Sequence, residues 1–386
     1  MTLFTRKQIY LDNAATTKID ERVLKEMIPY LSKNFGNPSS LYKLGKESRI
    51  AIENSRKKIS DFLKCKQDEI IFTSGATESN NLAIKGLALA HPEKKHIITS
   101  QIEHSSVLLV CKEMERLGYK VDYISVDKSG ILNLQELKNK ITKDTLLVSI
   151  MHVNNEIGTI QPIEEIGKVC HQNNILFHVD ATQSFGKIKI DLTNINLLSA
   201  SAHKLNGPKG TGLIYIKDLT KIRPMLNGGS QERKLRAGTE NVAGIVGFGK
   251  AIELAKEKMK NNEKVKKLRD FMIDEILKIK GSYLNGSREK RIFNNANFRF
   301  DGVEGEAILI MLDQENIAVS TGSACSSSSL KPSYVLTSMG LKPEETHSSL
   351  RISLGYENTK KEINFAIKKI KSSVEKIRKI SGEFKC

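Results

Sequence analysis

The chain has 386 residues and a formal net charge of +17 at pH 7. Hydrophobic residues make up 39% of the chain and charged residues 27%. This composition is typical of a globular protein large enough for two domains, and no apolar run is long enough to cross a membrane. The five cysteines, Cys65, Cys111, Cys170, Cys325 and Cys386, include no CxxC pair, which argues against a disulfide framework and against a clustered zinc site.

The sequence also indicates in which compartment the protein works and whether it binds nucleic acid. The first ten residues carry no apolar segment of signal-peptide length, so we expect a cytoplasmic protein with reduced thiols. The positive charge raises the question of a nucleic-acid partner, but the lysines are spread along the chain and tryptophan is absent. We therefore expect a solvated basic surface and no direct binding of nucleic acid.

The first part of the chain predicts a short strand, two helices and a turn suited to anions. The strand around residues 9–11 runs into small residues at 12–17, and an amphipathic helix is expected around 21–32. A second strand at 69–74 ends at Gly75, and the turn that follows opens another helix. Free N–H groups at a helix start bind anions, so this turn is a candidate phosphate site, although as a lone signal it is weak.

Strands and helices then alternate, which predicts an α/β fold with a mostly parallel central sheet covered by helices on both faces. The expected strands are residues 96–100, 120–126, 146–155, 176–183, 197–204 and 212–217. Polar side chains follow several of them, including His104, Asn155, Asp180 and Gln183. Because ligands of open α/β sheets bind at the carboxyl ends of strands, we expect these groups to converge on one site.

The stretch from Ser199 to Lys204 places a lysine at the end of a buried strand, and Asp180 ends the preceding one. A lysine that attacks a carbonyl needs a desolvated setting, and pyridoxal 5'-phosphate (PLP) needs such a lysine together with a carboxylate for its ring nitrogen. Ser201 and His203 are natural phosphate donors. Either residue alone would be read as an ordinary strand-end aspartate or surface lysine, but the pair favours a Schiff-base lysine in a PLP site.

The remaining chain predicts a smaller α+β domain. The polar loop at 228–241 is too long to be without function. The lysine-rich stretch 256–267 marks the expected boundary, which gives a large PLP-binding domain of residues 16–257 and a small domain of residues 1–15 and 258–386. Arg351 lies inside an apolar strand, where it must be paired, and a carboxylate ligand would pair it through two hydrogen bonds.

Cys325 lies among serines in a loop of about residues 320–332. A thiol that reacts with one group and then presents itself to another needs mobility and small neighbours, which this loop offers. A serine-rich surface linker with an incidental cysteine is the alternative on the loop alone.

Ten motifs together resemble the cysteine desulfurases of the class V aminotransferase family, close to the NifS/IscS type. They are YLDNAATT, FGNPSS, FTSGATESNNLA, EHSSV, SIMHVNNEIGTIQP, HVDATQS, SAHK, RAGTEN, STGSACSSSS and SSLRISLG. The resemblance runs from about residue 8 to 360. It implies a PLP-dependent enzyme of fold type I, homodimeric, that takes sulfur from L-cysteine and leaves L-alanine. The serine-rich setting of Cys325 is similar to the branch with a long cysteine loop.

The resemblance also implies a role for each matching residue. The catalytic residues would be Lys204, Cys325 and His104, with His104 stacked on the cofactor ring. The substrate would be bound by Arg351, Asn155 and Asn13. The cofactor would be bound by Ala76, Thr77, Asn155, Asp180, Gln183, Ser201, His203, Lys204 and, from the neighbouring subunit, Thr239. No metal is expected.

The expected partners are L-cysteine, a second copy of the chain and a sulfur-acceptor protein, such as an iron–sulfur scaffold or a tRNA-thiolation enzyme. Two alternatives within the same chemistry stay open, a selenocysteine lyase and a class V transaminase, and the transaminase would not need Cys325. A sulfur-delivery or RNA-binding protein without enzymatic activity is the alternative of a different class. Lys204 with Asp180 argues against it, because a binding module needs no electron sink.

Overall fold

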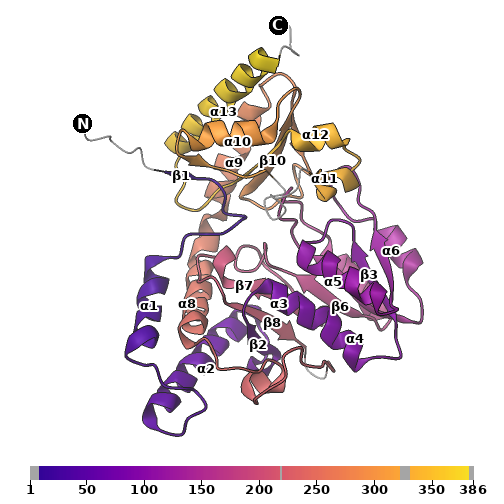
Figure 1. Ribbon diagram of the computed structural model, residues 1–386, viewed down its shortest axis with the longest axis vertical. Coiled ribbons are helices and arrows are strands. Elements are labelled where there is room, and N and C mark those ends of the chain that lie inside the picture. Colours follow the sequence, from indigo (N-terminus) through magenta and orange to yellow (C-terminus); the bar gives the residue numbers. More distant parts are fainter. Residues whose placement is uncertain (1–7, 218–219, 322–330, 382–386) are drawn as a thin grey trace.

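The computed structural model describes residues 8–217, 220–321 and 331–381 (Figure 1). Cys325, with the centre of its predicted loop, and Cys386 lie outside these residues. Within them, no helix combines the length and the apolar character that a membrane span requires.

The larger body of the protein is built on a seven-stranded sheet in the order β2-β8-β7-β6-β5-β3-β4. Strand β8 runs opposite to the other six strands, which share one direction, so the expected mostly parallel α/β sheet is confirmed. The strands are β2 (Ile70–Thr73), β3 (His96–Ser100), β4 (Lys120–Ile124), β5 (Thr145–Met151), β6 (Leu176–Asp180), β7 (Leu197–Ser201) and β8 (Gly212–Ile216).

Helices cover both faces of this sheet, because its central strands are apolar on both sides. Every residue of β5 is buried, as expected of a parallel strand between two helical layers. One apolar cluster joins the sheet to α1 (Glu21–Ser32), α2 (Lys43–Leu63), α6 (Leu134–Lys140), α7 (Ile163–Gln172) and α8 (Val242–Lys258). A second cluster on the other face holds the π-helical turn η2 (Leu82–Gly86), α4 (Leu87–Ala90) and α5 (Ser105–Arg116), and α3 (Ala76–Asn81) leads directly into η2.

Glycines allow α8 to pack closely against α1 and α2. A Cβ atom at Gly247 would lie 2.6 Å from Met27 Sδ, and one at Gly249 would lie 2.8 Å from Ser55 Cβ. The glycines at these two positions therefore serve close packing between helices.

The smaller body has its own apolar core around a three-stranded antiparallel sheet in the order β12-β10-β9. Its elements are α9 (Asn262–Ile276), β9 (Ser282–Asn285), β10 (Asn295–Phe300), α10 (Gly305–Asp313), β11 (Ile317–Ala318), α11 (Tyr334–Ser338), α12 (Pro343–His347), β12 (Ser349–Ser353) and α13 (Lys360–Ser381). The predicted boundary after residue 257 falls in the last turn of α8, and η5 (Met259–Asn261) joins that helix to α9. The exact division into two domains stays a prediction.

The N-terminal segment connects the two bodies. Strand β1 (Ile9–Tyr10) pairs in parallel with β11, and Asp12 forms a bridge with Ser353 of β12. The chain then crosses to the large sheet, where the Thr17 N–H donates to the His203 carbonyl at 2.9 Å. Residues 12–17 therefore lie between the carboxyl ends of the large sheet and the small sheet.

Candidate active site

Lys204 lies where β7 ends. The strand runs to Ser201, and the short 3-10 helix η3 (Ala202–Lys204) turns the lysine toward the N-terminal segment. Its Nζ donates to the carbonyls of Ala14 and Ala15, at 2.7 Å each. The side chain is half-buried and is held by neutral carbonyl groups in these two contacts, which suits an amine that must react.

Asp180 ends the neighbouring strand β6 and is 4% exposed. One carboxylate oxygen accepts from Asn80 Nδ2 at 2.8 Å, and the other accepts from the Thr182 N–H at 2.9 Å. Each oxygen is thus fixed by a donor, and a carboxylate held in this way is suited to a cationic ring nitrogen. Residues 199 and 180 pair in register, so Asp180 and Lys204 come from adjacent strand ends, as predicted.

His104 is linked to Asp180 through two polar side chains. Its Nδ1 lies 2.8 Å from Ser106 Oγ, and Ser106 Oγ accepts from Asn80 Nδ2 at 2.9 Å. His104 is also the N-cap of α5, because its Nδ1 accepts from the Ser106 N–H. The ring is therefore fixed at the same edge of the sheet as Asp180.

The four predicted phosphate ligands come from two neighbouring turns. Ala76 and Thr77 begin α3, Ser201 ends β7, and His203 lies in η3. The backbones approach closely here, because a Cβ at Gly212 would lie 2.5 Å from Gly75 Cα. A Cβ at Gly75 would project beside Ser201 Oγ at 3.9 Å, so glycine keeps the space before the helix start open.

His203 is electrically neutral at pH 7. Burial, followed by the nearby charges of Lys204, Lys209 and Lys187, lowers the pKa of His203 to about 4. Its Nδ1 lies 3.1 Å from Thr16 Oγ1. A neutral imidazole placed there can contribute a hydrogen bond but no charge to an anion.

Arg351 is buried in β12 and is paired, as its position in an apolar strand predicted. Its Nη2 donates to Asp12 Oδ1 at 2.9 Å, and its Nη1 donates to the Asn155 carbonyl at 3.1 Å. Two buried atoms beside these contacts have no partner in the described structure, Arg351 Nε and Asn155 Oδ1. Asn13 lies next to them, since its Nδ2 donates to the Ser353 carbonyl at 3.0 Å.

Gln183 faces the same N-terminal segment, and its Nε2 donates to the Ala14 carbonyl at 2.9 Å. Gln183 and Lys204 therefore donate to the same carbonyl, that of Ala14. Thr239 is exposed in the loop before α8, and in the described residues no hydrogen bond joins it to this group. Cys325 lies outside the described residues, so its predicted role stays a prediction.

Three residues of the site were missed by reasoning from sequence. Asn80 holds Asp180, Asp12 holds Arg351, and Lys187 donates to Gln183 Oε1 at 3.3 Å. Asn80 follows Ala76 by four residues, which is one helical turn, so the helix period was a usable signal. Lys187 likewise follows Gln183 by four residues.

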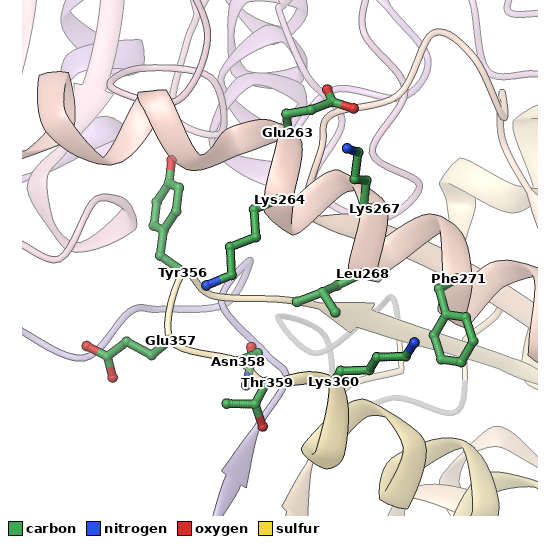
Figure 2. A pocket seen from close by; sticks show the side chains of 10 residues that line it. All are labelled: Glu263, Lys264, Lys267, Leu268, Phe271, Tyr356, Glu357, Asn358, Thr359 and Lys360. Carbon is green, nitrogen blue, oxygen red and sulfur yellow. The ribbon is translucent and has the colours of Figure 1, made fainter.

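Two cavities among the described residues bear on the location of the site. One of about 660 Å³ is bordered by α9 and the segment before α13, and Figure 2 shows Lys264, Lys267 and Lys360 around it. None of the predicted site residues lines this cavity. The other, of about 1010 Å³, is lined by Asn13 and Lys204 together with Lys187, and it is the cavity that meets the predicted site.

The described cysteines have thiols that ionise poorly. Burial, with Glu103 next in size, raises the pKa of Cys111 to about 12, and burial raises that of Cys170 to about 12. Cys65 is half-buried, and burial with Glu69 also raises its pKa to about 12. Since only the thiolate reacts, we expect iodoacetamide at pH 7 to label these three at least about a hundredfold more slowly than free cysteine. Peptide mass spectrometry over time measures this, and rapid labelling of Cys111 or Cys170 in folded protein would contradict it.

The comparisons with known proteins agree with this geometry. The family model described as "Aminotransferase class-V" matches residues 9–365. A curated relative from Dictyoglomus turgidum, "Cysteine desulfurase IscS", is 51% identical over 97% of this chain and 97% of its own length. A solved "NIFS-LIKE PROTEIN" superposes with a TM-score of 0.89 at 38% identity, covering 95% of this chain and 98% of that one. Another, "SspA in complex with cysteine", gives a TM-score of 0.81 at 38% identity over 91% of this chain and 100% of that one.

The fold and the matched family define a PLP-dependent enzyme of fold type I. The chain belongs to the class V aminotransferase family.

The residues present fit this cofactor. The Asp180 carboxylate is buried at the end of one strand and accepts a hydrogen bond at each oxygen, and the Lys204 amine follows the next strand. Gly75 keeps open the space before a helix start. Asn155 Oδ1 and Arg351 Nε are buried polar atoms without partners, which a polar ligand would satisfy.

Proposed function

We propose that this protein takes the sulfur of L-cysteine, releases L-alanine and holds the sulfur as a persulfide on Cys325. Its class is a PLP-dependent cysteine desulfurase, in line with relatives that are 51% identical over 97% of the chain. The observation that carries the proposal is the position of residues 12–17. This segment contacts Lys204 and Gln183 on one side and Arg351 on the other. An amine for the cofactor and a cation for a substrate carboxylate are therefore both held by the same short segment.

Each residue has a distinct task in the proposed reaction. Bound PLP supplies an aldehyde for the lysine and a ring that draws electrons away from the substrate Cα. Asp180 would hold the cationic ring nitrogen of the cofactor, and His104 would lie against its ring. Lys204 removes the proton from the substrate Cα and returns protons to the product. Arg351 orients the substrate by binding the substrate carboxylate, and the unpartnered Nε of Arg351 is the available donor.

Sulfur transfer is assigned to Cys325. Its thiolate attacks the substrate sulfur, so that a sulfur–sulfur bond forms while the bond between the substrate Cβ and sulfur breaks. The electron pair of the broken bond stays with carbon, which is protonated to give alanine. A soft thiolate is suited to attack on sulfur, where a hydroxyl is a poor nucleophile.

The test is to incubate the purified protein with L-cysteine and a thiol reductant and to measure alanine and sulfide. We expect the two products in equal amounts. Alanine without sulfide, or a dependence on an added keto acid, would favour a class V transaminase. A much faster reaction with L-selenocysteine would favour a selenocysteine lyase.

The second copy of the chain is proposed to cover an apolar patch on α1 and α2, which lie at the lower left of Figure 1. Large apolar side chains are exposed along both helices and the segment between them, with Phe35 at 72% and Leu41 at 80%. The α1–α2 patch consists of Leu24, Ile28, Leu31, Phe35, Leu41, Tyr42 and Ile50. A patch of this kind marks a protein interface. Thr239, exposed in its own subunit, would then reach the phosphate of the partner subunit.

Replacing Leu31 and Phe35 together by Glu is expected to give a monomer that loses PLP on gel filtration, because a shared phosphate site ties cofactor affinity to association. Analytical ultracentrifugation and the visible absorbance of the bound cofactor measure the two effects. Ile310→Glu is the control, since Ile310 is 58% exposed on α10, far from the patch. A dimeric double variant would show that the interface lies elsewhere. A wild-type monomer with tightly bound PLP would contradict the dependence on the dimer.

Further parts of the proposal concern the cell. We place the enzyme in the cytoplasm. The acceptor of its sulfur is a protein, either an iron–sulfur scaffold or a tRNA-thiolation enzyme. The spread of lysines over the chain supports a protein acceptor rather than nucleic acid bound directly.

A further inference from the structure

Lys187 is a buried lysine to which the proposed reaction assigns no role. It follows β6 in the turn that also holds Gln183, and it is 5% exposed. In the described part of the chain no carboxylate lies within ion-pair distance of it, and its hydrogen bond goes to the Gln183 side chain. Burying an ammonium group without an anion is costly. The position therefore calls for a functional reason.

A continuous chain of hydrogen bonds joins Lys187 to the reactive lysine. Lys187 Nζ donates to Gln183 Oε1 at 3.3 Å, and Gln183 Nε2 donates to the Ala14 carbonyl at 2.9 Å. The same carbonyl accepts from Lys204 Nζ at 2.7 Å. Both lysines also line the cavity of about 1010 Å³.

This chain fixes the orientation of the Gln183 amide. The Ala14 carbonyl can only accept, so the amide nitrogen must face Ala14, and the amide oxygen then faces Lys187, which donates to it. Nε2 carries two hydrogens, and the bond to Ala14 uses one of them. The other is left for an acceptor in the site. Without Lys187, the bond to the Ala14 carbonyl would be the remaining restraint on the amide within this chain of hydrogen bonds, and Gln183 Oε1 would lose its donor.

We propose that Lys187 is a positioning residue that holds the Gln183 amide with its N–H toward the ring oxygen of the cofactor. The inference rests on the proposed function, in which Gln183 lies near that oxygen. A donor placed there favours the deprotonated form of the oxygen. Lys187 thus acts on the cofactor through Gln183, and the protein keeps it at a cost in stability.

The electrostatic surroundings support this assignment. Burial, followed by the charge of Lys204, lowers the pKa of Lys187 to about 7. The other charged or titratable neighbour indicated is His203, whose own pKa is lowered in part by Lys187. A cation that repels its neighbours and has no counter-ion contributes no stability that would explain its presence.

The test follows the pH titration of the visible absorbance of the bound cofactor in four proteins: wild type, Lys187→Met, Gln183→Leu and the double variant. We expect the midpoint to rise by about 1 pH unit in each single variant, a tenfold change in the equilibrium, because a donor to an anionic oxygen is lost. In the Gln183→Leu background, Lys187→Met should add less than about 0.3 unit. Lys18→Met is the control, because it removes an exposed lysine of the same cavity and should leave the midpoint unchanged.

A second measurement uses the cofactor-free protein. Lys187→Met should keep or raise its melting temperature, by about 2 °C, because an unpaired buried charge is replaced by an apolar side chain of similar length. A marked fall would show that Lys187 is merely structural and would overturn the inference.

The outcomes distinguish a failure of the positioning role of Lys187 from a failure of the role assigned to Gln183. If Lys187→Met shifts the midpoint equally with and without Gln183, the charge acts through space and the positioning role is wrong. It is also wrong if Gln183→Leu shifts the midpoint and Lys187→Met does not. If Gln183→Leu has no effect, Gln183 does not reach the cofactor, and both its assigned role and this inference fall.

Discussion

The Cys325→Ser protein is expected to bind PLP and L-cysteine normally and to lose sulfur transfer. Lys204, Asp180 and Arg351 are unchanged in this variant, so the visible absorbance and its response to cysteine should persist. A hydroxyl is far less ionised than a thiol at neutral pH and attacks sulfur poorly. The rate of alanine formation should therefore fall by about a hundredfold or more.

The location of the sulfur gives a second, independent readout. Wild-type protein given cysteine without reductant should carry one extra sulfur atom on the peptide that contains Cys325. Cys65, Cys111 and Cys170 should carry none, because burial raises the pKa of each thiol. Cys111→Ser serves as the matched variant and should keep full activity. A persulfide on another cysteine, or a wild-type rate from Cys325→Ser, would rule out the assigned role.

Lys204→Ala is expected to lose both the visible absorbance of a lysine-bound cofactor and essentially all turnover. The amine binds the cofactor and moves the substrate proton, and its removal should cost on the order of 10⁴-fold or more in rate. The two carbonyls that it contacts, Ala14 and Ala15, would lose these contacts. Absorbance spectra and borohydride reduction followed by peptide mass spectrometry measure the result.

Lys209→Ala is the matched control for this variant. Lys209 is exposed and lines the same cavity, so its loss should leave the spectrum and the rate unchanged. Should Lys204→Ala still form a borohydride-reducible linkage at a single lysine, that lysine and not Lys204 would be the attachment point.

Local patterns in the sequence were sufficient for the α/β fold and for much of the site. The predicted helix at 21–32 is α1, and the strand ends predicted to carry Asp180 and Lys204 do lie side by side. The strands expected at 146–155, 176–183 and 197–204 end earlier, at Met151, Asp180 and Ser201. After β6 the backbone turns at Asp180, whose side chain accepts from the Thr182 N–H, and after β7 it enters the 3-10 helix η3.

What the sequence did not reveal are contacts between distant positions. The bond from Asn80 to Asp180 spans 100 residues, and the ion pair of Asp12 with Arg351 spans 339. Periodicity shows which face of an element is buried, but it does not show which side chain of another element lies opposite. Lys187 illustrates the same limit, since a buried lysine cannot be told from a surface lysine by its neighbours in sequence.

The position of residues 12–17 has a consequence for the order of folding during synthesis. Asp12 and Asn13 precede the strands of both sheets in the chain, yet each of them has a hydrogen-bond partner in β12 (Ser349–Ser353). Contacts of such sequence separation carry a high loop-closure cost and form late. The central strands β3 to β7 can pair before that, since they lie within residues 96–201. The contacts of Asp12 and Asn13 with β12 therefore cannot form in the nascent chain before that strand has been synthesised, and the active site closes only after that.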